Sequence, residues 1–563
     1  MIPGAALLDA TLLYVSELLE SHGRHPMPGR YNPVMRTLST RATIALLLSA
    51  ACSLVGCAAN PSAPDAGTEP EVSQFVAETS ASSVLGPEAR FVGSSYPHVG
   101  LNGLFPVHGP DGCDVAVLQG GEDSFAIRLH ALKNAQRSIR IQALVFKGDE
   151  TGLRIAEILK QKKAAGLDVR VIVDALSNPW LQTQWMYFDL KQNGIEVEGY
   201  EALALQWLNE VPVPRLVPYT DPDQLDKRFH EKMWIIDGET DQGVAITGGL
   251  NIGNEYFRAN PDDPDSTWRD QDVVVRGAIV ADLVTAFDRN FDYFVGVKKS
   301  RGAFNTNLYW NATREVLDRT GKVPIHYTTD PKVVQNVAAL ESRQPALDFR
   351  GATCRFLQNR PRLRETYIQQ AYVKLIERAQ SEVLIANAYF VPTPSVFTAL
   401  TDAAKRCASV KLISNSPETN DLPEITLVGR GYYKDLLAVN ESPEVKSCRN
   451  PDAGLRIWEW VGQAADESSR NQGTMHSKFA VIDAQRCLVG SYNLDPRSEK
   501  LNSETAVVFL QPDLARELRV KFLYEDLRYA REVTPSQAAA FESPQSVIER
   551  FRKSLGQLFE EHL

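Results

Sequence analysis

The sequence predicts an α/β protein with two similar lobes, each a mostly parallel sheet flanked by helices, and one pseudo-two-fold site between them. Stretches with helical periodicity alternate with short apolar strands, which is typical of parallel sheets built from βαβ units. The same order of helix and strand occurs at 131–176 and again at 373–416. Each half also carries one copy of a short motif with a histidine, a lysine and an aspartate.

The internal repeat has a nearly constant spacing. The Ala-Gln pairs at 135–136 and 379–380 lie 244 residues apart, and the motif histidines, His230 and His476, lie 246 residues apart. Two copies are too few for a solenoid of stacked repeats. The residues between the halves, 326–346, are predicted to form a polar connector. The predicted parts are an N-terminal extension with an export signal (1–57), a flexible tether (58–94), a first lobe (95–330), a second lobe (345–535) and a helical tail (536–563).

The composition is that of a folded globular protein. The chain has 563 residues, of which 44% are hydrophobic and 23% are charged, and this length allows two or more domains. Its net charge of −10 counts against a nucleic-acid partner, because nucleic-acid-binding domains usually carry a basic patch. We therefore expect no nucleic acid, and we expect the protein to be a monomer.

An export signal is predicted near the N-terminus. Residues 42–55 form an uncharged apolar run that follows Arg36 and Arg41, an order that is typical of a secretory signal peptide. The run is too short for a good transmembrane helix. The tetrapeptide LVGC resembles a bacterial lipobox, so Cys57 is the expected lipid attachment site, with Cys52 as the weaker alternative. The expected product is a membrane-anchored lipoprotein on the periplasmic side of a bacterial envelope; a plain cleaved signal and a simple anchor are the alternatives.

The remaining cysteines are not predicted to have a catalytic role. Some cysteines of an exported protein are expected to form disulfides, but the sequence does not give their connectivity. Their odd number leaves at least one unpaired, and none has the spacing of zinc ligands. We expect no metal and no cofactor. These five residues are Cys113, Cys354, Cys407, Cys448 and Cys487.

The repeated motif places a histidine and a lysine on one face of an extended segment. The first copy reads H-E-K-M-W-I-I-D and begins at His230. Residues two apart on a strand share a face, so His230 and Lys232 point the same way, whereas Asp237 has the opposite parity. Asp237 is predicted either to be catalytic or to cap the turn that follows the strand. The second copy repeats these residues as His476, Lys478 and Asp483.

A segment of small residues and an asparagine follows each copy of the motif. These segments are 247–257 and 489–498, and their glycines allow a close approach of the backbone. Asn251 and Asn493 are predicted to donate to a phosphoryl oxygen beside the lysines. The alternative is that both asparagines are simple turn residues.

Each half also supplies an acidic residue shortly before an apolar strand. Asp270 and Glu504 occupy equivalent positions, with Asp272 as a competing candidate in the first half. A carboxylate that accepts one imidazole N–H fixes the tautomer and the orientation of the histidine. Asp270 and Glu504 are therefore predicted to orient the motif histidines.

The predicted constellation suits two-step displacement at phosphorus. One histidine attacks the phosphorus atom and forms a phosphohistidine, while the other protonates the leaving alkoxide and then deprotonates the incoming hydroxyl. Two displacements give retention of configuration. The lysines supply the positive charge, so the chemistry needs no metal.

The doubled H-x-K-x(4)-D motif, followed by G-G-L-N in one half and G-S-Y-N in the other, resembles the phospholipase D superfamily over most of residues 115–530. The longer segments GGLNIGNEYF and GSYNLDPRSEKLNSE resemble the cardiolipin synthase branch, in particular its C-type members. The resemblance implies two phospholipase D-like lobes and phosphatidyl transfer between phospholipids at a membrane surface. Phosphatidylglycerol is the implied substrate, and phosphatidylethanolamine is a second candidate. By analogy with the family, His230 is the nucleophile and His476 is the acid and base.

Three other functions remain alternatives. The first is an exported phosphodiesterase that acts on nucleic acid, and the second is a phospholipase D that only hydrolyses phospholipids. The third is a phospholipid-binding protein without activity, which would not require the histidines. Aromatic residues near the motifs, such as Tyr389, are expected to belong to the core, and residues 180–190 are the candidate membrane contact.

Overall fold

The structure, a computed structural model, describes most of the two predicted lobes. The described ranges are 105–174, 177–178, 180–200, 228–301, 327–360 and 365–541. All of them belong to a single contact unit that spans residues 64–563. The predicted export signal, Cys57, the tether and the chain after residue 541 lie outside the described residues.

The first half forms a mixed sheet, of which the described residues provide eight strands in the order β4-β3-β2-β6-β7-β8-β1-β9. The group β2–β4 is parallel, and the other neighbours pair antiparallel. The strands are β1 (Asp114–Leu118), β2 (Ser138–Ala143), β3 (Asp168–Asp174), β4 (Glu196–Tyr200), β6 (Met233–Ile236), β7 (Val244–Gly248), β8 (Asp272–Arg276) and β9 (Arg350–Gly351).

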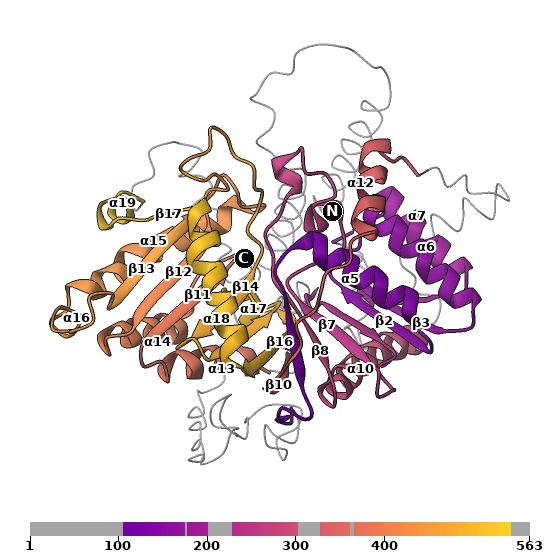
Figure 1. The fold of residues 1–563 in the computed structure, drawn as a ribbon, viewed down its shortest axis with the longest axis horizontal. Helices are drawn as coiled ribbons and strands as arrows, with labels where there is room; N and C mark the ends of the chain where they lie inside the picture. Colours follow the sequence, from indigo (N-terminus) through magenta and orange to yellow (C-terminus); the bar gives the residue numbers. More distant parts are fainter. Residues whose placement is uncertain are drawn as a thin grey trace, which may run out of the picture. The chain divides into compact units, whose positions relative to one another are not determined.

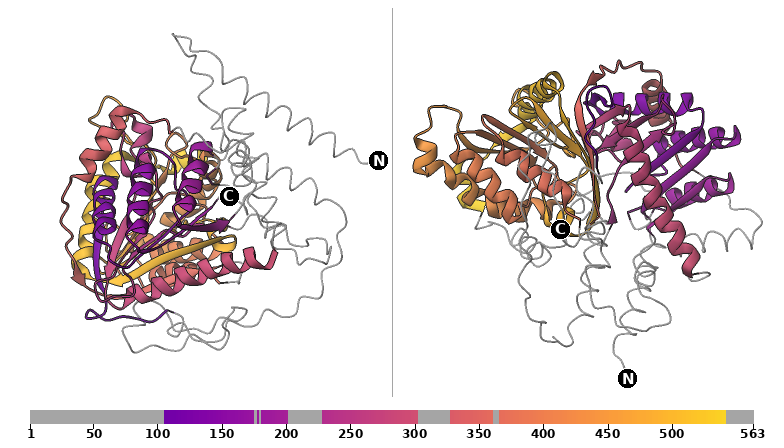
Figure 2. Two further views of the ribbon diagram at one scale, coloured as in Figure 1. Left: turned by 90° about the vertical axis from the view of Figure 1, so that its right-hand side faces the viewer. Right: turned by 90° about the horizontal axis from the view of Figure 1, so that it is seen from below.

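Helices cover both faces of this first sheet. Figure 2 shows α5, α6 and α7 side by side on one face, and α10 packs against the other. Strand β6 alternates accordingly, since Met233 and Ile235 join the core beneath α10 while Trp234 and Ile236 join the core beneath α5 and α6. The helices are α5 (Gly121–Asn134), α6 (Glu150–Ala164), α7 (Leu181–Gln192), α9 (Asn254–Phe257) and α10 (Ile279–Arg301).

The second half repeats this arrangement. Within the described residues its main strand order is β10-β16-β15-β14-β11-β12-β13-β17, and β5 (Arg228–Phe229) from the first half pairs with β16. The strands are β10 (Thr353–Asn359), β11 (Glu382–Asn387), β12 (Ser409–Asn415), β13 (Gly454–Trp460), β14 (Lys478–Ile482), β15 (Arg486–Gly490), β16 (Asn502–Leu510) and β17 (Ala530–Glu532). The helices are α13 (Tyr367–Glu377), α14 (Pro394–Lys405), α15 (Pro423–Ala438), α16 (Pro443–Lys446), α17 (Pro496–Lys500), α18 (Pro512–Val520) and α19 (Pro535–Phe541).

The predicted α/β architecture with two similar lobes is confirmed, but the prediction of mostly parallel sheets is wrong. Apart from the short β5–β16 pair, one group of three strands in each sheet is parallel, β2–β4 and β11–β13. The motif strands β6 and β14 run antiparallel to β2 and β11, and each then turns back through a short hairpin. Hairpin connections are too short for a crossover and therefore force antiparallel pairing.

The two lobes pack together through the strands that follow the motifs. Strand β7 contacts β15 and β16, and β8 contacts β15; β7, β8 and β16 lie near the centre of Figure 1. Thr247 Oγ1 lies 3.4 Å from Thr505 Oγ1 across this boundary. Buried apolar side chains from both lobes form one continuous core. The lobes are therefore not independent folding units joined by a linker.

The predicted polar connector contains a helix, α12 (Pro331–Glu341). Asp330 caps its N-terminus by accepting from the N–H of Lys332, at 2.8 Å, and a proline occupies the first turn. Val333, Val337 and Leu340 are buried in the core that includes α5 and α6. Their spacing places them on one face of the helix. Three apolar positions in a mostly polar segment are too few to predict this helix from the sequence.

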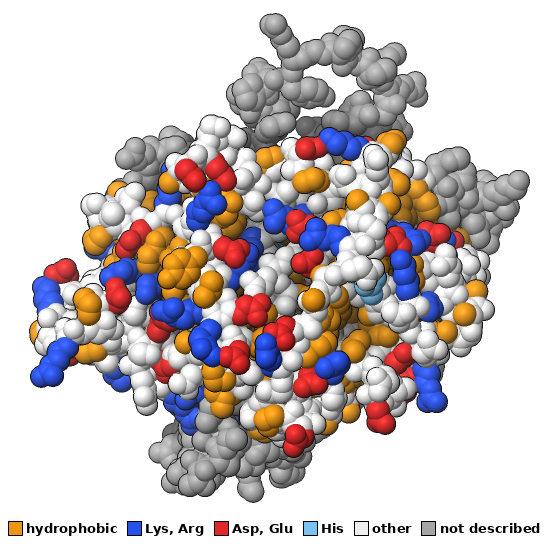
Figure 3. All heavy atoms as spheres, in the orientation of Figure 1, with side chains coloured by type: hydrophobic (Ala, Val, Ile, Leu, Met, Phe, Trp, Pro, Cys, Tyr) orange, Lys and Arg blue, Asp and Glu red, His pale blue; other side chains and the backbone are white. Residues whose placement is uncertain are grey.

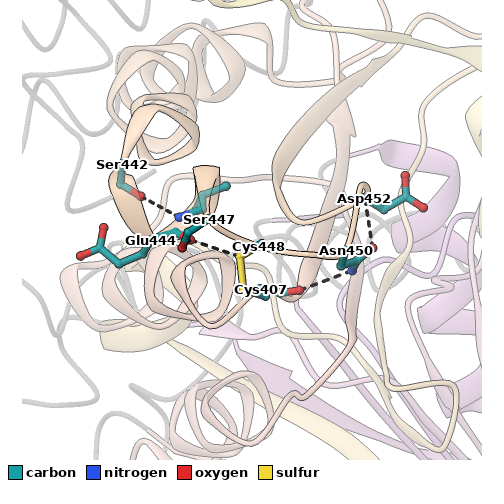
Figure 4. Close-up of a disulfide and its surroundings, with 8 residues drawn as sticks. Cys407, Ser442, Glu444, Ser447, Cys448, Asn450 and Asp452 are labelled. Atoms are coloured by element: carbon teal, nitrogen blue, oxygen red, sulfur yellow. Dashed lines mark hydrogen bonds between the residues drawn. A yellow bond between two sulfur atoms is a disulfide. The ribbon is translucent and has the colours of Figure 1, made fainter.

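The structure pairs four of the five cysteines. Cys113 lies in a disulfide with Cys354, which joins the first lobe to the second, and Cys407 pairs with Cys448. Figure 4 shows the second disulfide, where Cys407 follows α14 with a φ of 68°. Cys487 is buried and unpaired.

No helix in the described part of the chain combines the length and the apolar character needed to cross a bilayer. The segment 180–190, the candidate membrane contact, forms most of α7. Its Met186, Tyr187 and Leu190 are buried in the core, whereas Leu181 is 59% exposed. Most of the apolar surface of this segment therefore packs inside the protein.

Candidate active site

The backbone brings the segment before each motif histidine against the opposite half of the chain. Strand β5 pairs parallel with the start of β16, and the N–H of His230 donates to the carbonyl of Ser503 at 2.9 Å. A parallel bridge joins Arg269 to Met475 in the same way, and the N–H of His476 donates to the carbonyl of Arg269 at 2.6 Å. Both histidines are thus held by backbone contacts from the other lobe.

This pairing also places the carboxylate of each half beside the histidine of the other half. His230 Nδ1 lies 2.8 Å from Glu504 Oε2, and His476 Nδ1 lies 2.7 Å from Asp270 Oδ2. Each histidine therefore meets the carboxylate of the opposite half. A hydrogen bond from Nδ1 leaves the lone pair of Nε2 to act as nucleophile or base.

The two carboxylates are held by local features that differ between the halves. A Cβ atom at Gly249 would lie 2.0 Å from Asp270 Oδ1, so only glycine leaves room for this carboxylate. Ser491, which takes the place of Gly249 in the second half, donates its hydroxyl to Glu504 Oε2 at 2.5 Å. Ser498 donates to Glu504 Oε1 at 2.9 Å.

The competing candidate, Asp272, faces a different partner. Its Oδ2 accepts from Arg128 Nη2 at 2.6 Å and from the Ser124 hydroxyl at 3.1 Å, both on α5. Burial raises the pKa of Asp272, while Arg128 acts in the opposite direction. Asp272 thus anchors α5 to the sheet, and Asp270 is the carboxylate beside His476.

The motif lysines lie beside their own histidines and are buried. Lys232 Nζ donates to the carbonyl of His230 at 2.6 Å, and Lys478 Nζ donates to the carbonyl of His476. Burial lowers the pKa of Lys232 to about 7 and that of Lys478 to about 8. Within the described ranges no group of three or more His, Cys, Asp or Glu side chains is placed to hold a metal ion.

Burial also shifts the histidines and their carboxylates toward neutral forms. It lowers the pKa of both His230 and His476 well below the ordinary value. It raises the pKa of Asp270 to about 6 and that of Glu504 to about 7. Neutral imidazoles carry the lone pair that attack on phosphorus or removal of a hydroxyl proton requires.

The motif aspartates contact backbone amides rather than the histidines. Asp237 accepts from the N–H groups of residues 136–138 at 2.7–3.0 Å, and Asp483 accepts from those of residues 380–382 at 2.8–3.1 Å. Both adopt the left-handed conformation, with φ of 52° and 54°. Of the two interpretations left open for these aspartates, this geometry favours the structural one.

The predicted phosphate-binding asparagines differ in their contacts. Asn251 Oδ1 accepts from the N–H of Val145 at 3.1 Å, and its Nδ2 donates to the Tyr256 hydroxyl at 3.0 Å. Asn493 is buried, and no donor among the described residues lies within hydrogen-bond distance of its Oδ1. Contact between these amides and a phosphate remains a prediction.

Aromatic rings surround His476, and sequence reasoning assigned such residues to the core. Ring centroids lie 5.4 Å from His476 for Tyr256, 5.5 Å for Trp268 and 6.4 Å for Tyr389. The Tyr389 hydroxyl donates to Asp421 Oδ1 at 2.7 Å. Asp421 lies in a loop outside every motif, so the sequence offered no signal for it.

Comparisons with known proteins agree with the geometry. A family model described as the phospholipase D-like domain of cardiolipin synthase matches residues 129–291 and 372–525. The cardiolipin synthase of Geobacillus thermodenitrificans (strain NG80-2) is 26% identical over 418 residues, which cover 74% of this chain and 67% of that protein. A probable cardiolipin synthase of Bacillus subtilis (strain 168) is 26% identical over 446 residues, covering 79% and 71%.

A solved structure shares the fold. The phosphatidylserine synthase of Haemophilus influenzae Rd KW20 superposes with a TM-score of 0.55 at 14% identity. The alignment covers 81% of this chain and 98% of that one. At this level of identity, the similarity extends to the fold alone.

Proposed function

As the chain belongs to the cardiolipin synthase branch of the phospholipase D superfamily, we propose that it forms cardiolipin from phosphatidylglycerol through a phosphohistidine intermediate. Its enzyme class, a phospholipase D-type phosphatidyltransferase, follows from the family. The observation that carries the proposal is the exchange of Asp270 and Glu504 between the halves. This exchange supports a single site with two oriented imidazoles and two lysines.

In the proposed first step, His230 Nε2 attacks the phosphorus atom of one phosphatidylglycerol. The bound phosphodiester anion favours the imidazolium form of His476. The phosphorus–oxygen bond to the head-group glycerol breaks, and this imidazolium gives its Nε2 proton to the departing oxygen. In the second step His476 takes the proton from a hydroxyl of a second phosphatidylglycerol. That oxygen attacks the phosphohistidine, which releases His230 and yields cardiolipin.

The lysines are proposed to stabilise the charge on the non-bridging oxygens in both steps. Burial lowers the pKa of Lys232 to about 7, so in the empty site its charge is easily lost. An anionic phosphodiester close to Lys232 and Lys478 raises both pKa values, because an opposite charge favours the protonated form. The site is thereby complementary to a phosphodiester and to its more highly charged transition state.

The charge of the protein favours a lipid over nucleic acid. The net charge is −10, and Figure 3 shows basic and acidic side chains interspersed over the visible face. A nucleic-acid substrate would be expected to meet a continuous basic surface. Simple phospholipid hydrolysis differs only in the acceptor of the second step, which would be water.

The proposed location is the periplasmic side of a bacterial envelope, with a lipid on Cys57. Two cysteine pairs at bonding distance support it, because disulfides persist mainly in oxidising compartments. A tether from a lipid anchor would keep the site close to its substrate. Mass spectrometry of the N-terminal peptide tests the anchor. A diacylglyceryl group on Cys57 is expected, and an unmodified Cys57 would contradict the proposal.

Product analysis tests the function. We would incubate the purified chain from residue 60 onward with phosphatidylglycerol vesicles, with and without phosphatidylethanolamine. Cardiolipin is the expected product, and phosphatidic acid alone would indicate hydrolysis instead. Cleavage of DNA with neither lipid product would contradict the proposal. Loss of turnover in His230→Ala and in His476→Ala would assign the product to this site.

A further inference from the structure

The two halves of the site differ beside the histidines. Strand pairing aligns Ser138 with Asp168 in the first lobe and Glu382 with Ser409 in the second, which sets the equivalence of the two halves. By this equivalence Tyr389 corresponds to Val145, and the residues after them form matching bridges, Phe390 with Leu494 and Phe146 with Ile252. The second half therefore offers a phenol that is hydrogen-bonded to a carboxylate, Asp421, where the first half offers an apolar valine.

This pair lies close to the reacting groups. Tyr389 donates to Asp421 Oδ1 at 2.7 Å, and its ring centroid lies 6.4 Å from that of His476. Lys478 Nζ lies 5.9 Å from the centroid of the same ring. Burial lowers the pKa of Lys478 to about 8, and Asp421 is among the carboxylates that oppose this shift. The Asp421 charge thus acts on the His476 side of the site.

Hydrogen bonds fix the loop that carries Asp421 to the segment that leads into His476. Asn415 Nδ2 donates to the carbonyl of Met475 at 2.7 Å, and the N–H of Met475 donates to Asn415 Oδ1 at 3.0 Å. The Thr474 hydroxyl donates to the carbonyl of Thr419 at 2.7 Å. Asn420 Oδ1 accepts from the N–H of the residue after Asp421 at 2.9 Å. The carboxylate is therefore preorganised relative to the histidine.

Besides the Tyr389 hydroxyl, Asp421 can accept from a bound substrate only where that substrate offers a donor, and a phosphodiester offers none. An ionised carboxylate only accepts hydrogen bonds, and it repels a phosphodiester anion. The departing alcohol leaves opposite the attacking His230, and the incoming alcohol arrives on the same side, where His476 exchanges protons with both. The alcohol next to His476 is therefore the group that can supply a donor.

We propose that Asp421, held by Tyr389, accepts a hydrogen bond from a free hydroxyl of the glycerol head group on the His476 side of the site. This inference rests on the proposed function and names the feature of the alcohol that the site selects. The selected feature is a second hydroxyl on the alcohol that leaves or attacks. Asp421 is then a specificity-determining residue, whereas the phosphate is bound by groups that both halves share.

Competition between two alcohols of equal chain length tests the inference. Phosphatidylglycerol is the donor, and deuterium-labelled glycerol and 1-propanol are the acceptors at equal concentration. The measured quantity is the ratio of labelled phosphatidylglycerol to phosphatidylpropanol, determined by mass spectrometry. This ratio does not depend on the amount of folded enzyme, so a poor yield of a variant does not affect it.

The wild-type enzyme is expected to favour glycerol, and Asp421→Ala is expected to lower the ratio at least tenfold. A hydrogen bond to a charged group contributes about 1.5–3 kcal/mol, which corresponds to at least that factor. Asp421→Asn, which keeps an acceptor, and Tyr389→Phe, which frees the carboxylate, should each lower the ratio less. The matched control is Asp402→Asn on α14, which should leave the ratio unchanged because its side chain is half exposed and pairs with Lys405 on the same helix.

The outcomes separate this inference from the proposed function. A wild-type enzyme without phospholipid transfer or hydrolysis would overturn the proposed function. Transfer with an unchanged ratio in Asp421→Ala would overturn only the role of Asp421. A parallel competition with 3-amino-1-propanol distinguishes hydroxyl from ammonium recognition. If Asp421→Ala lowers use of the amino alcohol more than use of glycerol, the hydroxyl assignment is wrong.

Discussion

The motif lysines show the energetic compromise in this site most directly. Lys232 is 1% exposed and Lys478 is fully buried, although each ends in a group that water solvates strongly. The positive charge of Lys478 lowers the pKa of Lys232 further, whereas the surrounding carboxylates oppose the effect of burial on both lysines. Such an arrangement is unfavourable in the empty protein and becomes favourable when a phosphodiester binds. The free energy of unfolding should therefore be lower than that of a variant without these two charges.

Replacement of Lys232 by methionine should stabilise the empty protein at neutral pH. The native pKa of Lys232 is about 7, below the ordinary value of about 10.4, so the unfolded chain binds more protons than the native protein between these pH values. By linkage, wild-type stability then rises with pH across this window, and the variant lacks this rise. The melting temperature of Lys232→Met should exceed that of wild type by about 2 °C or more at pH 7.

Thermal melts of both proteins at pH 7 and pH 9 check this expectation. The difference in melting temperature should shrink at pH 9, and the variant should have no transferase activity at either pH. Lys405→Met on the exposed face of α14 provides the control and should show no pH-dependent difference. A variant that melts below wild type at pH 7 would contradict the argument.

The motif aspartates should support stability rather than chemistry. In Asp237→Ala the amides of residues 136–138 lose their acceptor, and alanine must adopt a φ of 52°. We expect a loss of about 2–4 kcal/mol in stability from the unsatisfied amides and the left-handed backbone together. The same reasoning applies to Asp483→Ala.

Activity per folded molecule separates the two roles. In Asp237→Ala and Asp483→Ala the turnover number, corrected for the folded fraction, should stay within about threefold of wild type. Asp270→Ala should instead lose about 10²–10⁴ in turnover, because His476 loses its orienting carboxylate. A loss of that size in Asp237→Ala would assign the aspartate to catalysis.

Among the secondary-structure elements, those with a clear apolar periodicity of their own could be predicted from the local sequence. The helix–strand units around β2–β3 and β11–β12 follow from apolar periodicity, and both motif strands were placed correctly. The direction of β6 and β14 depends on which strands they join, and that choice is made by tertiary pairing. Helix α12 was missed because only three of its side chains reach the core. The Tyr389–Asp421 pair was missed because loop partners leave no periodic signal.

The disulfides are an element-scale feature that chemistry can check. Peptide mapping of the non-reduced protein should find one linked pair from Cys113 and Cys354 and another from Cys407 and Cys448. Cys487 should react with an alkylating reagent only after unfolding, because it is buried and burial raises the pKa of its thiol.

Stability measurements test how much the disulfide between Cys407 and Cys448 contributes to the free energy of unfolding. The Cys407–Cys448 bond closes a loop with a sequence separation of 41, so its loss should cost about 3–4 kcal/mol in the chain-entropy description. The double variant Cys407→Ser/Cys448→Ser should therefore melt below wild type in the absence of reductant. Recovery of more than one reactive thiol from the unfolded, non-reduced chain from residue 60 onward would contradict the pairing.

On the scale of the whole molecule, the exchange of carboxylates makes the two lobes one catalytic unit. Sequence alignment showed that Asp270 and Glu504 are equivalent, but it could not show which histidine each one meets. That pairing depends on β5 joining β16 and on the bridge between Arg269 and Met475, both of which connect the lobes. The shared core and the Cys113–Cys354 bond hold this arrangement in place.

A single shared site has a quantitative consequence for variants in the two lobes. If each lobe were an independent site, Asp270→Asn and Glu504→Gln would each leave about half of the wild-type activity. In one shared site each should lose about 10²–10⁴ in turnover, since both histidines are required in every cycle. The double variant should lose far less than the product of the two single losses, because residues that act as a unit are not additive. Turnover of the four proteins with phosphatidylglycerol, corrected for folded fraction, measures this coupling. Purely multiplicative losses would mean that the two carboxylates act independently, and half-activity in either single variant would mean two separate sites.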